Sequence, residues 1–247
     1  LALLREKTDQ LTQWAQGFHL MLRFVLVDAR HWQVSSHPSS AVGGPRSGSD
    51  GRRLDKFYQT AQVLAGVYPA WWLVPTAYEG DYAATLQALY HTGAVDKSQC
   101  VDFGGLGALA SDDFAGAGLR QIYQAIDSPY QSVLMLILLE IYARQLPHID
   151  CLAQAYKNRI YRMQLSLDDL DPYVMLYQKI ESYLLAHDQT KRLELIRRCF
   201  YFKVGLKLSQ RTHALGWRHK LMDNLVQSWG WSAAALKHLD AVRAWTI

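Results

Sequence analysis

The sequence is poor in cysteine and contains no long hydrophobic run. Its three cysteines, Cys100, Cys151 and Cys199, lie far apart, and no CxxC spacing occurs. This excludes a disulfide framework or a zinc site built on cysteine pairs, and it favours a reducing, cytoplasmic location. The longest purely apolar run, residues 133–139, is much shorter than the roughly 20 residues that cross a bilayer. No signal peptide opens the chain, so we expect a soluble protein.

Charge of one sign is not gathered into a run or a tail. The formal net charge is +4 at pH 7, and Lys and Arg are spread along the sequence, so nothing favours nucleic acid as a partner. The nine histidines show no HxxxH spacing, which gives no sign of a histidine metal site. Half of the 247 residues are hydrophobic, enough to bury a substantial core in one large domain or two small ones.

The first 80 residues show an α/β pattern. A helical stripe over residues 1–18 starts with no capping residue ahead of it, so we expect a piece of a longer protein. Residues 20–27 form a nearly continuous apolar run, which is typical of a buried strand. Asp28 follows at its carboxyl end, where ligands of open α/β sheets collect. Residues 71–75, WWLVP, predict a second short buried strand.

Between these two strands the sequence predicts a loop and a helix. Residues 35–53 are rich in Gly, Ser and Pro and lack apolar periodicity, which indicates a mobile loop. Residues 54–66 restore helical spacing and end at Gly66, a residue suited to a C-cap.

From residue 81 onward the pattern is helical, with short breaks. Ser111, Ser128 and Asp171 are placed as N-caps, and the last two precede Pro at the first helical position. The predicted helices span residues 81–92, 112–126, 129–145, 151–163, 172–187, 191–209, 218–229 and 232–243. Together with the amino-terminal pattern, they predict an α+β fold.

The aromatic pairs Trp71/Trp72 and Trp229/Trp231 lie in apolar segments. Aromatic residues in such segments are far more often core than base-stacking residues. We therefore expect both pairs to pack.

Residues 113–142, DFAGAGLRQIYQAIDSPYQSVLMLILLEIY, resemble a segment of bacterial class I adenylate cyclases. The resemblance continues in order through VDFGGLGAL (101–109), LDPYVML (170–176), RLELIRRCFYFKVGLKLS (192–209) and GWRHKLMDNLVQSWGW (216–231). It covers nearly the whole chain, which is therefore identified as a member of that family. The resemblance implies that residues 1–80 are the carboxyl-terminal part of a nucleotidyltransferase domain, of the kind found in DNA polymerase β. Residues 81–247 would then form a helical domain.

The resemblance also implies an activity for the parent protein. It would be a lyase of bacterial signalling that converts ATP into 3′,5′-cyclic AMP and pyrophosphate. The superfamily holds two Mg²⁺ (or Mn²⁺) ions with a Gly-Ser turn, an Asp-x-Asp pair and a third acid, because both the attacking and the leaving oxygens carry charge. Asp28 matches the third acid, as a catalytic and metal-binding residue. The Gly-Ser and Asp-x-Asp motif has no equivalent in this chain, so we expect the chain alone to be inactive.

Partners beyond ATP are only broadly indicated. The resemblance implies a carboxyl-terminal regulatory region, which members of this family share. A regulatory protein would act through such regions, which are absent from this chain. The oligomeric state is left open.

Four residues are candidates for contacts with the ATP phosphates. Lys203 and Lys207 lie one turn apart on the predicted helix 191–209, beside its apolar face, and Arg192 points in a similar direction. Ser128 precedes a helix amino end, which is a natural phosphate site. Structural alternatives stay open: Lys and Arg stems commonly cover apolar surface, Ser128 suits an N-cap, and Asp28 suits a turn.

Three positions where the family carries Lys are occupied here by Gln124, Gln131 and Met135, and Arg120 is the only new cation nearby. Each lost charge-assisted phosphate contact removes roughly 1.5–3 kcal/mol of binding. The alternative function is therefore a degenerate, non-catalytic relative that senses nucleotides or binds proteins. A third alternative is nucleotide transfer to the hydroxyl of a protein or a small molecule.

Overall fold

The computed structural model describes residues 2–18, 51–106, 113–146, 148–210 and 216–243, together with residues 22, 24 and 26. The chain is α+β and mostly helical, and it divides into two compact units. Unit 1 comprises Leu1–Asp113 and Pro147–Tyr161, and unit 2 comprises Phe114–Leu146 and Arg162–Ile247. The predicted domains are different from these units: a nucleotidyltransferase-like part over residues 1–80 and a helical domain over residues 81–247. That division stays a prediction.

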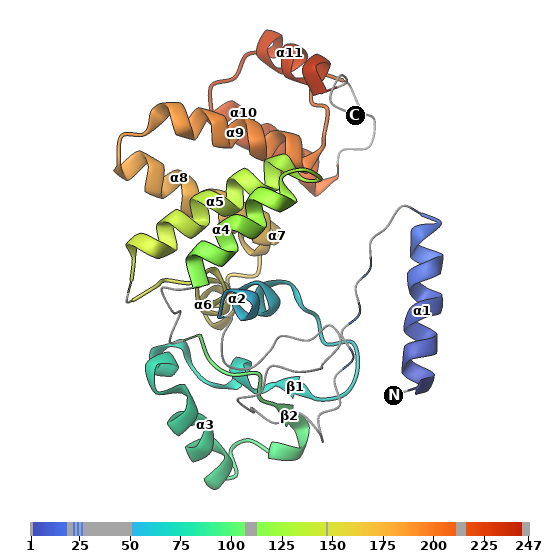
Figure 1. Ribbon diagram of the computed structural model, residues 1–247, viewed down its shortest axis with the longest axis vertical. Coiled ribbons are helices and arrows are strands. Elements are labelled where there is room, and N and C mark those ends of the chain that lie inside the picture. Colours follow the sequence, from blue (N-terminus) through green and yellow to red (C-terminus); the bar gives the residue numbers. More distant parts are fainter. Residues whose placement is uncertain are drawn as a thin grey trace. The chain divides into compact units, whose positions relative to one another are not determined.

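Unit 1 combines helices with one small sheet. Its α-helices are α1 (Ala2–Gln16), α2 (Gly51–Thr60), α3 (Tyr82–His91) and α6 (Leu152–Tyr161) (Figure 1). Short 3₁₀ helices are η1 (Ala70–Leu73), η2 (Thr76–Asp81) and η3 (Lys97–Gln99). Strands β1 (Tyr68–Pro69) and β2 (Cys100–Val101) pair in parallel, and α2 packs against α6.

The predicted strand over residues 71–75 is wrong, because the chain forms η1 there and continues into Val74 and Pro75. Trp71 and Val74 are fully buried, whereas Leu73 is 38% exposed, and no strand among the described residues pairs with this segment. Instead, the carbonyl groups of Trp71 and Val74 accept hydrogen bonds from the ammonium of Lys157. Tertiary packing therefore replaces a strand ladder at this position.

Other amino-terminal predictions have mixed outcomes. The helix over residues 1–18 is confirmed as α1, although Leu11 and Phe18 of its stripe are about half exposed or more. The helix expected over residues 54–66 begins earlier, at Gly51, and ends at Thr60. Most of the predicted strand over residues 20–27 and most of the predicted loop over residues 35–53 lie outside the described residues.

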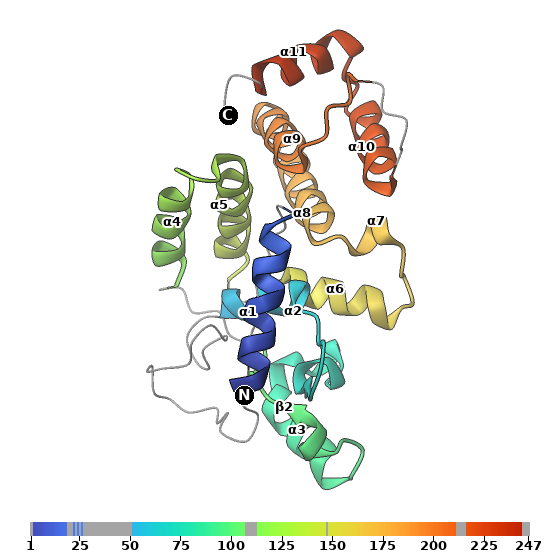
Figure 2. The same cartoon turned by 90° about the vertical axis from the view of Figure 1, so that its right-hand side faces the viewer.

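Unit 2 is helical throughout the residues that the structure describes. Its helices are α4 (Asp113–Gln124), α5 (Pro129–Arg144), α7 (Leu167–Leu170), α8 (Pro172–Ala186), α9 (Thr190–Val204), α10 (Trp217–Ser228) and α11 (Ala233–Arg243). The core lies where α5, α8 and α9 pack against one another. The views agree that α4 lies beside α5 (Figures 1 and 2). Leu134, Leu138 and Ile141 face this core at the three- and four-residue spacing of an amphipathic helix.

Two helix ends show why the sequence pattern is only partly followed. Asp171 is the predicted N-cap of α8, and its carboxylate accepts from the amides of Tyr173 and Val174 at 2.8 and 3.1 Å. The helix predicted to reach Ser209 ends instead at Val204, because Gly205 adopts a left-handed conformation with φ of 84°. The predicted cap Ser111 lies outside the described residues.

The prediction that the Trp pairs pack is confirmed. Trp71 is fully buried and stacks on Tyr58, with ring centres 4.2 Å apart. In unit 2, Trp229 is 8% exposed and contacts Tyr177 and Trp231 at 5.4 and 4.9 Å between ring centres. Among the described helices, none has the length and apolar character needed to cross a membrane.

Candidate nucleotide-binding site

Asp28, the predicted catalytic and metal-binding acid, lies outside the described residues. Within the described part of the chain, no group of three or more His, Cys, Asp and Glu side chains is placed to hold a metal ion. Among the described residues, the candidate site therefore consists of the side chains predicted to contact phosphate.

Ser128 is the N-cap residue of α5, as its sequence predicts. Its side chain makes no capping hydrogen bond, while its carbonyl accepts from the Ser132 amide at 3.0 Å. The first amide groups of an α-helix have no intrahelical acceptor, and the helix dipole places partial positive charge there. The hydroxyl of Ser128 and the first turn of α5 thus form an end suited to an anion.

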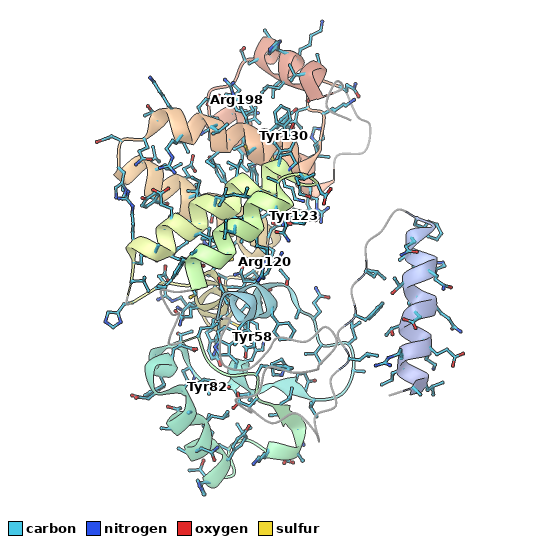
Figure 3. The ribbon with its side chains drawn as sticks, in the orientation of Figure 1. Tyr58, Tyr82, Arg120, Tyr123, Tyr130 and Arg198 are labelled. Atoms are coloured by element: carbon cyan, nitrogen blue, oxygen red, sulfur yellow. The ribbon has the colours of Figure 1, made fainter. Side chains whose placement is uncertain are left out.

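Lys203 lies at the same end of the helical core as Ser128. The rings of Tyr130 in α5 and Phe202 in α9 are 4.9 Å apart, so the start of α5 meets the end of α9. The Lys203 ammonium lies 5.5 Å from the centre of the Tyr173 ring, at the start of α8. Figure 3 labels Tyr130 at this position. The antiparallel packing of α5 and α9 thus places the end of α9, which carries Lys203, at the same end of the helical core as the amino end of α5.

Lys207 follows the end of α9 rather than standing one turn further along it. Two hydrogen bonds hold the segment that carries Lys207, one to α9 and one to α11. The Leu208 amide donates to the Tyr201 hydroxyl at 3.1 Å, and the Ser209 amide donates to the Asp240 carboxylate at 3.0 Å. Lys207 itself is exposed. It lies near the carboxyl end of α9, on a segment anchored to α9 and α11.

Arg192 lies at the opposite end of α9 from Lys203. The two residues are eleven positions apart along the helix, which is about 16 Å along the axis. The Arg192 guanidinium pairs with Glu140 in α5, with Nη1 3.2 Å from Oε1, and this cation lowers the pKa of the Glu140 carboxyl. The structure therefore does not bring Arg192 together with Ser128 and Lys203, and it gives Arg192 a structural partner.

A shallow, open hollow lies along α9 on the solvent side. Thr190, Lys191, Glu194, Leu195 and Arg198 line it. Arg198 and Glu194 form an ion pair within it at 3.1 Å. Because all its walls come from one helix, the hollow cannot enclose a nucleotide.

Sequence reasoning missed a buried polar cluster in unit 1. Lys157 is fully buried and Glu79 is 6% exposed, and both contact Trp71. Burial lowers the pKa of Lys157 to about 8, although the Glu79 charge opposes that shift. Both Glu79 carboxylate oxygens lie 3.0 Å from the Trp71 Nε1 donor. No spacing in the sequence marks these residues, which are 78 positions apart along the printed chain.

Comparisons with known proteins agree with the residue patterns. Residues 109–247 match the family profile described as adenylate cyclase, class-I, second domain, and residues 1–72 match the adenylate cyclase NT domain. The chain is 37% identical over 247 residues to adenylate cyclases of Salmonella typhimurium and Escherichia coli K12, which covers 99% of this chain. It is 36% identical over 251 residues to that of Proteus mirabilis. The chain spans 29% of the length of these relatives. No solved structure gives a significant match.

Proposed function

We propose, from the premise that the chain belongs to the class I adenylate cyclase family, that it is part of an enzyme converting ATP into cyclic AMP and pyrophosphate. In this proposal the described residues bind the triphosphate, and the chemistry is completed by acids that this chain does not supply. The observation that supports the site is the contact of Tyr130 with Phe202, which brings the start of α5, with Ser128, and the end of α9, with Lys203, to the same end of the helical core.

The first two turns of α5 carry no positive side chain that could contact a phosphate. Gln131 and Met135, in its first two turns, are uncharged. In this proposal Lys203, at the end of α9, supplies the cation for the triphosphate. A Lys ammonium and free amide groups both favour the charged oxygens of a triphosphate. Lys207, on its anchored segment after α9, would contact the outer phosphate or its solvent shell.

Metal chemistry belongs to the proposal through Asp28. A nucleotidyltransferase-type enzyme of this family would use Mg²⁺ or Mn²⁺, which stabilises charge on the reacting phosphate oxygens when bound. Asp28 would be one ligand of such an ion, with carboxylates from outside this chain. The described residues contribute binding and orientation of the triphosphate, and no step through the metal is derived from them.

The test is an ATP titration of cyclic AMP formation with Mg²⁺ and with Mn²⁺, in the full-length protein. Removing the Lys203 cation by Lys203→Met should raise the KM for ATP by about 10-fold or more, from the loss of one charge-assisted phosphate contact. Lys220→Met, which removes an exposed Lys of α10, is the matched control and should leave KM unchanged. Equal behaviour of the two variants would reject the site.

The same titration separates the alternative functions. Absence of cyclic AMP from the full-length protein with either metal would reject the cyclase activity. ATP binding without turnover, measured by calorimetry, would then indicate a nucleotide-sensing relative. If Lys203→Met also abolished this ATP binding, the result would support the proposed phosphate site and reject only the proposed cyclase activity.

A further inference from the structure

The segment that follows α9 has little burial of its own, yet two buried side chains hold it. None of residues 205–210 is buried, and Lys207 is exposed. The side chains that hold the segment are Tyr201 on α9, which is fully buried, and Asp240 on α11, which is 6% exposed. Irregular segments with few buried apolar contacts open readily. Apolar packing therefore holds this segment only weakly, and its polar contacts gain importance.

These polar contacts form a connected chain that ends at the two amides directly after Lys207. The Tyr201 hydroxyl donates to Asp240 Oδ1 at 2.7 Å and accepts from the Leu208 amide at 3.1 Å. Asp240 Oδ2 accepts from the Ser209 amide at 3.0 Å. Because the hydroxyl both donates and accepts, each of its hydrogen bonds strengthens the other. The chain of contacts therefore fixes the backbone at Lys207.

The backbone conformation of the segment agrees with this anchoring. Gly205 ends α9 in the left-handed region, with φ of 84°, which lets the chain fold back toward Tyr201. The Gln210 amide donates to the Lys207 carbonyl at 3.3 Å, which closes a turn over residues 207–210. Lys207 is thus the first residue of a turn whose next two amides are bonded to buried side chains.

The burial of Asp240 is costly, and its hydrogen bonds indicate what it does. A buried carboxylate lowers stability unless it is hydrogen-bonded, and apolar residues of similar volume often stabilise a protein more. Asp240 accepts from the Tyr201 hydroxyl and from the amide of the exposed residue Ser209. These bonds order the exposed segment that carries Lys207.

We propose that Asp240 and Tyr201 are positioning residues for the triphosphate site. They hold the backbone at Lys207, so that its ammonium stays near the end of α9, where Lys203 also lies. The role rests on the proposed function, in which both lysines contact the phosphates. Ordering a flexible side chain on binding reduces affinity. A backbone that is already fixed before ATP binds reduces this loss.

Trypsin cleavage after Lys207, in the full-length protein without nucleotide, measures the anchoring. Cleavage requires the segment to open, so its rate follows the population of the open form. Tyr201→Phe keeps the buried ring and removes the hydroxyl, so cleavage should be about 10-fold faster or more, as expected for a lost buried hydrogen bond. Asp240→Asn should act in the same direction, because one of its acceptor oxygens becomes a donor. Cleavage after Lys220, an exposed Lys of α10, should not change.

An ATP titration of the same protein tests the positioning role. Tyr201→Phe should raise the KM for ATP by about 3-fold or more with kcat unchanged, because Lys207 is then ordered only on binding. In a Lys207→Met background, Tyr201→Phe should add nothing, since no cation remains to be positioned.

Tyr183→Phe is the matched control for the loss of a hydroxyl. The Tyr183 hydroxyl donates to the Glu140 carboxylate at 2.9 Å, and this carboxylate pairs with Arg192 at the other end of α9. Its removal should leave both the KM for ATP and the cleavage after Lys207 unchanged.

Three results would overturn the proposal. They are an unchanged cleavage rate after Lys207 in both anchor variants, an unchanged KM in Tyr201→Phe, and an equal rise in KM when Tyr201→Phe is added to Lys207→Met. Lys203→Met separates these results from failure of the proposed function. If it raises KM while Lys207→Met does not, the phosphate site stands and only the positioning role is rejected. If neither raises KM, the site and the positioning role both fail, whatever the cleavage rates.

Discussion

The Lys157 ammonium lies 4.0 Å from the centre of the Trp71 ring and also donates a hydrogen bond to the Trp71 carbonyl. The indole Nε1 of the same residue donates to Glu79 at 3.0 Å. Trp71 thus contacts a buried cation and a buried anion. Unpaired buried charges are costly, whereas hydrogen-bonded ones are tolerated. The stability of unit 1 should therefore be sensitive to small changes in this cluster.

Glu79→Gln should lower the free energy of unfolding by about 1–3 kcal/mol. The Glu79 carboxylate accepts from Trp71 Nε1 and from the Leu106 amide. Both donors reach Oε1, so a glutamine oxygen in that place still accepts from them. The new NH₂ group takes the place of Oε2, 3.0 Å from Trp71 Nε1, so two donors face each other in a buried site. Urea unfolding followed by Trp fluorescence measures the change. Glu6→Gln, on the exposed surface of α1, should have no effect, and equal stability of both variants would contradict the prediction.

The pKa of Lys157 predicts how stability depends on pH. Burial lowers this pKa from 10.5 to about 8. The unfolded chain then binds more protons than the folded chain between about pH 8 and 10.5, so the contribution of Lys157 to the free energy of unfolding rises with pH in that window. A neutral amine still has two N–H groups for the carbonyls of Trp71 and Val74.

Lys157→Met isolates this contribution. The difference in unfolding free energy between the wild type and the variant should grow by on the order of 1–3 kcal/mol from about pH 7 to 10. Tyr and Cys groups titrate in both proteins and cancel in the difference. Urea titrations at several pH values provide the measurement. A difference that stays flat or shrinks would show that Lys157 keeps an ordinary pKa.

The helical half of the chain was predictable because its signals are local. The three- and four-residue spacing of Leu134, Leu138 and Ile141 marks α5, and Asp171 before a proline marks the start of α8. Gly205 was an available signal for the end of α9, but the apolar pattern that continues past it concealed the break. The position of Lys207 was misjudged for that reason.

The amino-terminal half depended on contacts that no local pattern reveals. The carbonyls of Trp71 and Val74 are satisfied by Lys157, which lies 86 and 83 positions away in the chain. A short apolar run covered in this way has the same sequence appearance as a buried strand. The position of Ser128 and Lys203 at the same end of the helical core likewise depends on how α5 packs against α9. The sequence could identify both residues as candidates but could not show that they lie at one end.

Gly105→Ala should destabilise unit 1. A Cβ at Gly105 would lie 2.7 Å from Tyr82 Cγ and 3.0 Å from a Glu79 carboxylate oxygen. Relief of this overlap must move the ring or the carboxylate, at a cost of about 1–3 kcal/mol. Thermal unfolding measures the loss. Gly80→Ala is the matched control, because a Cβ there meets nothing within 4 Å. A Gly105→Ala variant as stable as Gly80→Ala would contradict the close packing.

Arg192 should act through Glu140 and not through ATP. Their side chains are 38 and 28% exposed, so solvent screens the pair and its coupling should be only about 0.5–1 kcal/mol. A double-mutant cycle with Arg192→Met and Glu140→Gln, measured by urea unfolding, gives that coupling free energy. The pKa of Glu140 is lower in the folded than in the unfolded chain, and this predicts how the stability depends on pH. The contribution of Glu140 to the free energy of unfolding is full above the unfolded pKa of about 4.3 and is lost as pH falls below it.

The kinetic part of this prediction separates the two ends of α9. Arg192→Met should leave the KM for ATP unchanged in the full-length protein, whereas Lys203→Met should raise it. The reason is the separation of about 16 Å along the helix, which exceeds the reach of one phosphate group. An equal rise in KM for both variants, with no coupling between Arg192 and Glu140, would place the triphosphate along the whole of α9. The anion site would then be the helix side and not the amino end of α5.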